Sequence, residues 1–108
     1  MNNIFIYRVL LLLLLLNIKY KNITIVGQWK SIDNENEYYY IFNEDKTCSY
    51  KMPVARLNCT YEDDGEKLTI TFKGKETPIT YRYQIDKGVL IIKDISGKEN
   101  KFVKTHLD

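Results

Sequence analysis

The sequence predicts an all-β fold, an eight-stranded antiparallel up-and-down meander that closes into a small barrel and is preceded by an apolar N-terminal helix. After residue 22, apolar residues recur at every second position, which is the period of half-buried strands. Turn signals divide the 87 residues from Asn22 to Asp108 into eight short runs. Such even spacing is typical of a meander that closes on itself. A β-sandwich is the alternative, and pairing of the first strand with the last would exclude it.

The segment 1–21 is much more apolar than the rest of the chain. Residues 9–16 read VLLLLLLL, and the apolar run extends over 15 residues from Ile4 to Ile18. As a helix this run is about 22 Å long at 1.5 Å per residue, which suits a signal peptide or a short membrane anchor. No pair of small residues follows to specify cleavage, so we favour a retained anchor over a cleaved signal.

The charged residues before and after the leucines predict different compartments for the folded domain. Arg8 and the free amino terminus resemble the charged start of an export signal, whereas Lys19 and Lys21 weakly favour a cytoplasmic domain. We favour export, because short leucine cores are more often secretory. Residues 22–108 are then expected to form the folded domain, secreted or membrane-anchored outside the cytoplasm, with the N-terminal helix contacting the membrane.

The expected strands follow one another with one face apolar and the other rich in Thr and charged residues. Their ranges are 27–31, 38–43, 47–52, 57–62, 68–73, 79–86, 89–93 and 101–105. Strands this short leave room in an eight-stranded barrel for side chains or for one small ligand. We expect the interior to be filled by the inward aromatic residues Trp29, Phe42, Tyr50, Tyr61, Phe72, Tyr81 and Tyr83. Four apolar residues are expected on the outer face, either as ordinary scattered exposed residues or as part of an interaction surface: Tyr39 and Ile41, and separately Val89 and Ile91.

Two hairpins fix the expected register. A turn at Pro53-Val54 places Cys48 directly opposite Cys59 and Tyr50 opposite Leu57. Paired Cα atoms lie about 4.5–5.5 Å apart, which allows a disulfide if the compartment is oxidising. The alternative is two small buried hydrophobic residues in a reduced core. A metal site is not expected, because no histidine or second cysteine pair is near.

The second hairpin is expected to turn at Asp64-Gly65. This turn pairs Tyr61 with Leu68 and, on the outer face, Glu62 with Lys67. Both hairpins place the same side of the middle strand in the core, so the two registers agree with each other.

With the strands assigned, the motif Gly27-Gln28-Trp29 gains significance, because it resembles the G-x-W signature of lipocalins. The stretches 40–47, 64–70 and 81–92 follow in an order similar to that of the small lipocalin-like domains of secreted bacterial proteins. This resemblance implies that Trp29 closes the base of the barrel and that Gly27 lets the chain pack against it. It also implies binding of a small apolar or amphipathic ligand.

The residue inventory argues against an enzyme. No Ser/His/Asp set, phosphate loop or zinc motif can be assembled, and the single histidine, His106, is third from the end. No cofactor is therefore expected. Three of the 16 basic residues and none of the 14 acidic ones precede residue 22, which leaves 13 basic and 14 acidic residues in the domain. That balance lacks the basic excess of a nucleic-acid-binding surface.

Two functional hypotheses remain, with a degenerate enzyme-like barrel as a weaker third. In the first, a small apolar or amphipathic ligand binds at the barrel mouth against Tyr50, Tyr61 and Tyr83. In the second, the barrel is filled and the domain is a protein–protein interaction or structural module. An open mouth lined by these tyrosines favours the first hypothesis, and a filled interior favours the second.

Overall fold

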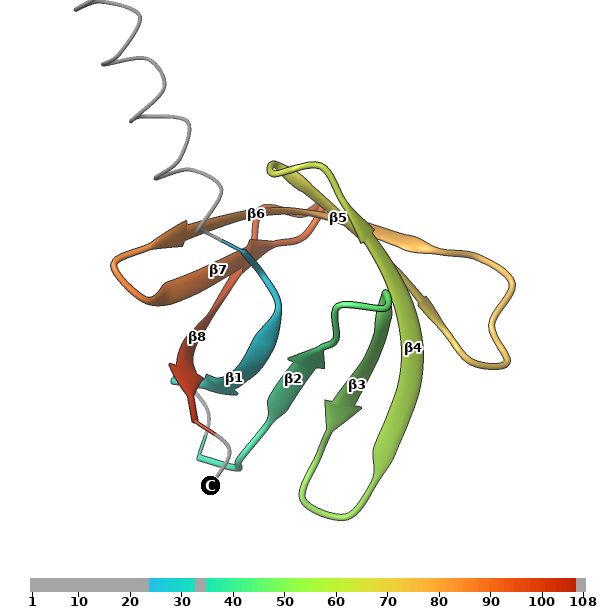
Figure 1. Cartoon of the computed structure of the whole chain (residues 1–108), viewed down its shortest axis with the longest axis horizontal. Coiled ribbons are helices and arrows are strands. Elements are labelled where there is room, and N and C mark those ends of the chain that lie inside the picture. Colours follow the sequence, from blue (N-terminus) through green and yellow to red (C-terminus); the bar gives the residue numbers. More distant parts are fainter. Residues whose placement is uncertain (1–23, 33–34, 107–108) are drawn as a thin grey trace, which may run out of the picture.

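In the computed structural model, residues 24–32 and 35–106 are described, and they form one closed eight-stranded β-barrel (Figure 1). Every strand pairs with its neighbour in sequence, and all pairings are antiparallel. The predicted N-terminal helix lies outside the described residues. Within the described ranges, no helix has the length and apolar character needed to cross a membrane. The strands are β1 (Gly27–Ser31), β2 (Tyr39–Phe42), β3 (Thr47–Lys51), β4 (Arg56–Asp63), β5 (Lys67–Phe72), β6 (Ile79–Asp86), β7 (Val89–Lys93) and β8 (Glu99–Thr105).

Pairing of β1 with β8 closes the barrel. Ser31 lies opposite Phe102, and Trp29 lies opposite Lys104. This pairing excludes the β-sandwich and confirms the predicted meander. Because each connection joins adjacent antiparallel strands, short turns suffice throughout the fold. In Figure 1 the longer connection between β5 and β6 reaches outward from the barrel.

The β3–β4 hairpin has the predicted register. Cys48 lies opposite Cys59 and Tyr50 opposite Leu57. The turn is closed by a hydrogen bond of 2.8 Å from the Met52 amide to the Ala55 carbonyl, which leaves Pro53 in a position where its missing N–H costs nothing.

The β4–β5 hairpin differs from the prediction. Its two central residues are Gly65 and Glu66, not Asp64 and Gly65, so Tyr61 lies opposite Ile70 and Glu62 opposite Thr69. Of these two central residues, only Gly65 has a positive φ, +95°, which suits the first position of a type II′ turn. The predicted pairs of Tyr61 with Leu68 and Glu62 with Lys67 are therefore wrong.

The Asp64 side chain explains this shift. Its Oδ1 accepts hydrogen bonds from the amides of Glu66, at 2.9 Å, and Lys67, at 2.7 Å. These bonds hold the pKa of Asp64 below its usual value. The turn moves by one residue and the register by two, so every side chain keeps its predicted face.

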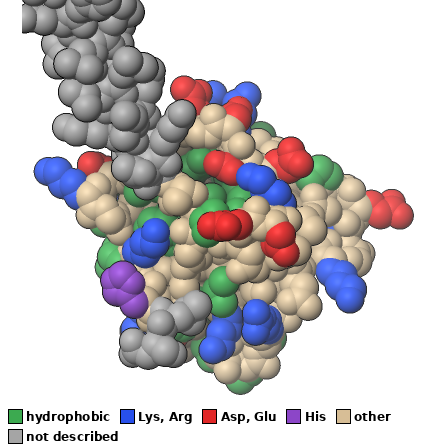
Figure 2. Space-filling view, viewed as in Figure 1, with side chains coloured by type: hydrophobic (Ala, Val, Ile, Leu, Met, Phe, Trp, Pro, Cys, Tyr) green, Lys and Arg blue, Asp and Glu red, His purple; other side chains and the backbone are tan. Residues whose placement is uncertain are grey.

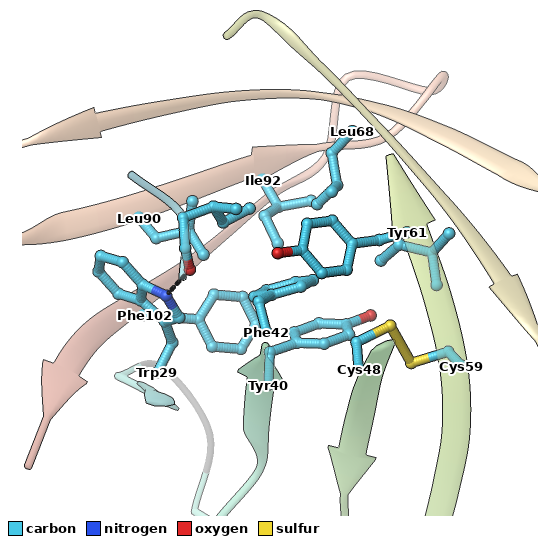
Figure 3. Packing of buried hydrophobic residues seen from close by; sticks show 12 residues of the cluster. Trp29, Tyr40, Phe42, Cys48, Cys59, Tyr61, Leu68, Leu90, Ile92 and Phe102 are labelled. Atoms are coloured by element: carbon cyan, nitrogen blue, oxygen red, sulfur yellow. Dashed lines mark hydrogen bonds between the residues drawn. A yellow bond between two sulfur atoms is a disulfide. The ribbon is translucent and has the colours of Figure 1, made fainter. Parts of the chain in front are cut away.

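Aromatic and aliphatic side chains fill the barrel interior (Figure 3). The predicted inward aromatics all lie in the core or pack against it, with Tyr50, Phe72, Tyr81 and Tyr83 half-buried at its margins. On the outer face, Tyr39, Ile41, Val89 and Ile91 are also half-buried. Figure 2 shows acidic and basic side chains interspersed over the visible surface. The buried core consists of Ile25, Trp29, Tyr40, Phe42, Cys48, Cys59, Tyr61, Leu68, Ile70, Leu90, Ile92 and Phe102.

Candidate functional site at the ends of the barrel

Trp29 helps to seal the end of the barrel at which β1 begins and β8 ends, which we call the closed end. Its indole N–H donates a 2.7 Å hydrogen bond to the Ile25 carbonyl, as the dashed line in Figure 3 shows. The Lys104 ammonium lies 5.6 Å from the centre of the indole ring. Gly27 has a φ of +138°, and a Cβ at this position would lie 2.9 Å from Lys104 Cε. The flexible end of Lys104 could move away from such a Cβ, so it is the positive φ, which residues with a Cβ rarely adopt, that favours glycine at position 27.

Tyr61 contributes to the same seal. Its side chain is 2% exposed, and its hydroxyl donates a 2.6 Å hydrogen bond to the Asn43 carbonyl in the β2–β3 turn. Lys46, from the same turn, places its ammonium 5.2 Å from the centre of the Tyr61 ring and 3.4 Å from the Asp63 carboxylate. The β2–β3 turn thus lies over the core and covers it.

Tyr83 is tied to the closed end through Asp63. Its hydroxyl donates a 2.7 Å hydrogen bond to Asp63 Oδ2. Burial raises the pKa of Tyr83, and the adjacent Asp63 carboxylate raises this pKa further. Asp63 is therefore shared by a tyrosine hydroxyl and a lysine ammonium, which orders β4 and β6 at this end.

The opposite end leaves core-facing side chains accessible, and we call it the open end. Leu57 shares the inward face with Tyr50, and Ile79 shares it with Ile70. Nevertheless Leu57 is 44% exposed and Ile79 is 43% exposed. An inward-facing residue stays exposed only where nothing covers the end of the barrel. The residues of the open end are Tyr50, Leu57, Phe72, Ile79 and Tyr81.

An aromatic layer closes the interior beneath the open end. The centre of the Tyr40 ring lies 4.6 Å from that of Tyr50 and 5.5 Å from that of Phe102. Tyr38 stacks on Tyr50 with a centroid separation of 5.9 Å. Burial raises the pKa of Tyr40, and the nearby hydroxyls of Tyr81 and Tyr50 raise this pKa further. The open end is thus a shallow aromatic surface over a packed floor.

The three tyrosines predicted to form one ligand site lie at different ends of the barrel. Tyr50 belongs to the open end, whereas the hydroxyls of Tyr61 and Tyr83 are bonded at the closed end. A ligand role for the three stays a prediction. Sequence reasoning omitted Leu57 and Ile79 from the site, although alternation had placed both on the inward face. Counting residues from each turn would have assigned them to the open end, because Ile79 is the first residue of β6 and Leu57 is the second residue of β4.

Cys48 and Cys59 form a disulfide between β3 and β4, with a Cα–Cα distance of 4.9 Å. Both residues are buried beside the aromatic layer. The pairing agrees with the predicted register, and of the two alternatives that the sequence left open it corresponds to the disulfide. Because disulfides persist in oxidising compartments, it indicates an extracytoplasmic domain. Among the residues that the structure describes, no cluster of His, Cys, Asp or Glu is arranged to hold a metal ion.

A family model matches residues 23–104, which contain nearly the whole barrel. The chain belongs to DUF5640, a family of unknown function. A search of curated proteins and a search of solved structures each gave no match. The feature of this DUF5640 chain that bears most on function is the contrast between the closed and open ends of its barrel.

Proposed function

We propose that this DUF5640 domain is a non-enzymatic, lipocalin-like binding module that holds a small amphipathic molecule against the open end of its barrel. The observation that carries the proposal is the exposure of side chains that face the core. Leu57 and Ile79 retain more than two-fifths of their surface although both point inward. Covering such apolar surface stabilises a complex by about 25 cal/mol per Å².

The chemistry of the open end supports an amphipathic ligand rather than a purely apolar one. Leu57, Ile79 and Phe72 offer apolar surface to a ligand's hydrocarbon part. Tyr50 and Tyr81 add hydroxyl groups at the margin, and tyrosines in such places combine an apolar ring with a polar tip. Burial raises the pKa of both, so their hydroxyls stay protonated and can donate hydrogen bonds.

The packed interior supports binding at the end of the barrel rather than deep inside it. The floor of the open end is formed by Tyr40 and the disulfide, and both are buried. Burying a ligand beneath this layer would require moving close-packed side chains, which is costly in a protein core. The ligand is therefore expected to cap the barrel.

The disulfide and the apolar segment 1–21 support an exported or membrane-tethered location. The proposal that the domain is not an enzyme rests on the state of its cysteines and the position of its histidine. Both cysteines are joined to each other, and the only histidine, His106, follows the last strand. Among the described residues, no free thiol is therefore left to act as a nucleophile.

A protein–protein interaction module is the alternative function. Val89 lies opposite Val103 on the outer face, and Val103 is 37% exposed. With Ile91 nearby, this pair forms a small apolar surface that a partner protein would cover.

Binding of decanoic acid tests the proposal. The full-length chain, purified in a nonionic detergent, is titrated with decanoic acid below its micellar concentration, and the complex is detected by native mass spectrometry. Ile79→Ser is expected to weaken binding by about tenfold, since it removes most of one apolar contact. Val54→Ser is the matched control, because Val54 is 97% exposed at the tip of the β3–β4 turn.

Equal binding by the two variants would contradict the proposed site. If decanoic acid does not bind at all, while a Val103→Asp substitution releases a co-purifying protein, the interaction module is the better description.

A further inference from the structure

Three cationic side chains lie side by side on the outer face of β5, β6 and β7. Lys67 is directly opposite Arg82, and Arg82 is directly opposite Lys93. All three are exposed. Like charges at directly paired positions repel each other and destabilise a sheet. In the part of the chain that the structure describes, none of the three forms an ion pair, and Asp64 in the β4–β5 turn offsets only the charge of Lys67, whose proximity helps to lower the pKa of Asp64.

The row of cations borders a hollow that arises where β6 changes partners. β6 pairs with β5 through residues 79–82 and with β7 through residues 82–86, so Arg82 is paired on both sides. β7 ends at Lys93 and leaves residues 79–81 without a partner on that side. A hollow of about 450 Å³ opens there, lined by the three cations together with Thr80, Tyr81 and Asp94.

The carboxylate in this lining is already engaged by its own turn. Asp94 Oδ1 accepts hydrogen bonds from the Ser96 amide at 2.9 Å, the Ser96 hydroxyl at 2.6 Å and the Lys98 amide at 3.0 Å. Its charge therefore stabilises the β7–β8 turn. On β8, the strand next to β7, Glu99 lies opposite Lys93. The row of cations therefore ends at Lys93.

We propose that this hollow binds a compact oxyanion, a phosphate or carboxylate group of a small soluble molecule. Arg82 lies at the centre of the site, and its planar guanidinium suits a bidentate contact with such a group. Lys67 and Lys93 flank it as point charges. The bound anion offsets the repulsion that the fold leaves in place. The site is on the barrel wall, and its occupation does not require a ligand at the open end.

Titration with two simple anions tests this site. Inorganic phosphate and acetate are added separately to the isotope-labelled full-length chain in a nonionic detergent, and backbone amide shifts are followed by NMR. Saturable shifts are expected for the amides of Lys67, Arg82 and Lys93. Arg82→Gln is expected to weaken binding about tenfold or more, which is typical for the loss of a charged hydrogen-bond pair.

Lys101→Gln is the matched control, because Lys101 is an exposed outward lysine on β8 and its loss changes the net charge equally. Stronger binding of phosphate identifies a tetrahedral anion, and stronger binding of acetate identifies a carboxylate; either supports the site. Absence of saturation with both anions, or equal weakening by the two substitutions, would overturn it.

Thermal unfolding without added anion gives an independent readout. Arg82→Gln should raise the unfolding midpoint at low ionic strength, because it removes the central charge of three, and the gain should vanish at high salt. Lys101→Gln should not show this gain. A lower midpoint for Arg82→Gln at low salt would mean that Arg82 is a structural cation, which contradicts a binding role.

Discussion

The two ends of the barrel are built from the same alternating strands but differ in what covers them. At the closed end, the β2–β3 turn lies over Tyr61, and Asp63 links Lys46 to Tyr83. At the open end, Leu57 and Ile79 face the core and remain over 40% exposed. Alternation decides which face a side chain takes, whereas a covering turn decides whether it is buried.

Turn chemistry produces this difference. The β2–β3 turn has Lys46 in the left-handed region, with a φ of +72°, which residues with a Cβ usually avoid. The contacts of Lys46 with Asp63 and the Tyr61 ring offset that cost. The β3–β4 turn instead points Val54 into solvent. The stability of the domain is therefore expected to be concentrated at the closed end.

A pair of phenylalanine substitutions gives the largest expected contrast. Phe42 is 1% exposed and packs 4.9 Å from the Tyr61 ring, so Phe42→Ala should lower the free energy of unfolding by about 3–5 kcal/mol. Phe72 is half-buried at the open end, and Phe72→Ala should cost about 1–2 kcal/mol. Urea unfolding followed through Trp29, the only tryptophan, measures both. Equal costs would contradict the assignment of the ends.

Loss of the disulfide is expected to have the next largest effect. The bond joins residues 11 apart in sequence and restricts the unfolded chain, so Cys48→Ser with Cys59→Ser should lower stability by about 2–4 kcal/mol. Alkylation of unfolded protein taken directly from its source compartment tests whether the bond exists there. Two blocked thiols would contradict the extracytoplasmic location and leave the barrel register unaffected.

Removal of single hydroxyls gives the smallest contrast. Tyr61→Phe breaks the part-buried hydrogen bond to the Asn43 carbonyl and should cost about 1–2 kcal/mol in unfolding free energy. Tyr50→Phe should change this free energy by less than about 0.5 kcal/mol, because the Tyr50 ring is half-exposed and its hydroxyl makes no hydrogen bond within residues 24–32 and 35–106. Thermal unfolding of the three proteins provides the comparison. A larger loss for Tyr50→Phe would reverse the roles of the two ends.

The strands and their faces could be predicted because the period of two is a local property. The β3–β4 register was likewise predictable, since Pro53 restricts where the chain turns. The β4–β5 turn was not, because the Asp64 carboxylate competes as an acceptor for the turn amides and moves the turn by one residue. Such side-chain capping has no periodic signal in the sequence.

The candidate sites depend on long-range geometry and were less predictable. Alternation places Tyr50, Tyr61 and Tyr83 on one face, but their separation into two ends follows from strand direction and stagger. The row of cations formed by Lys67, Arg82 and Lys93 likewise depends on how neighbouring strands are aligned. Lys67 and Arg82 become neighbours through the register across the long β5–β6 connection, which no motif in the sequence fixes.

Binding at the open end over a filled interior is tested most directly by mapping a bound probe. Photoreactive decanoic acid is irradiated with the full-length chain, and adducts are located by peptide mass spectrometry. Adducts are expected at Tyr50, Leu57 and Ile79, and decanoic acid should compete with their formation. Adducts at the buried Phe42 or Leu90, with the open end unlabelled, would show that the ligand enters the interior and would contradict the account.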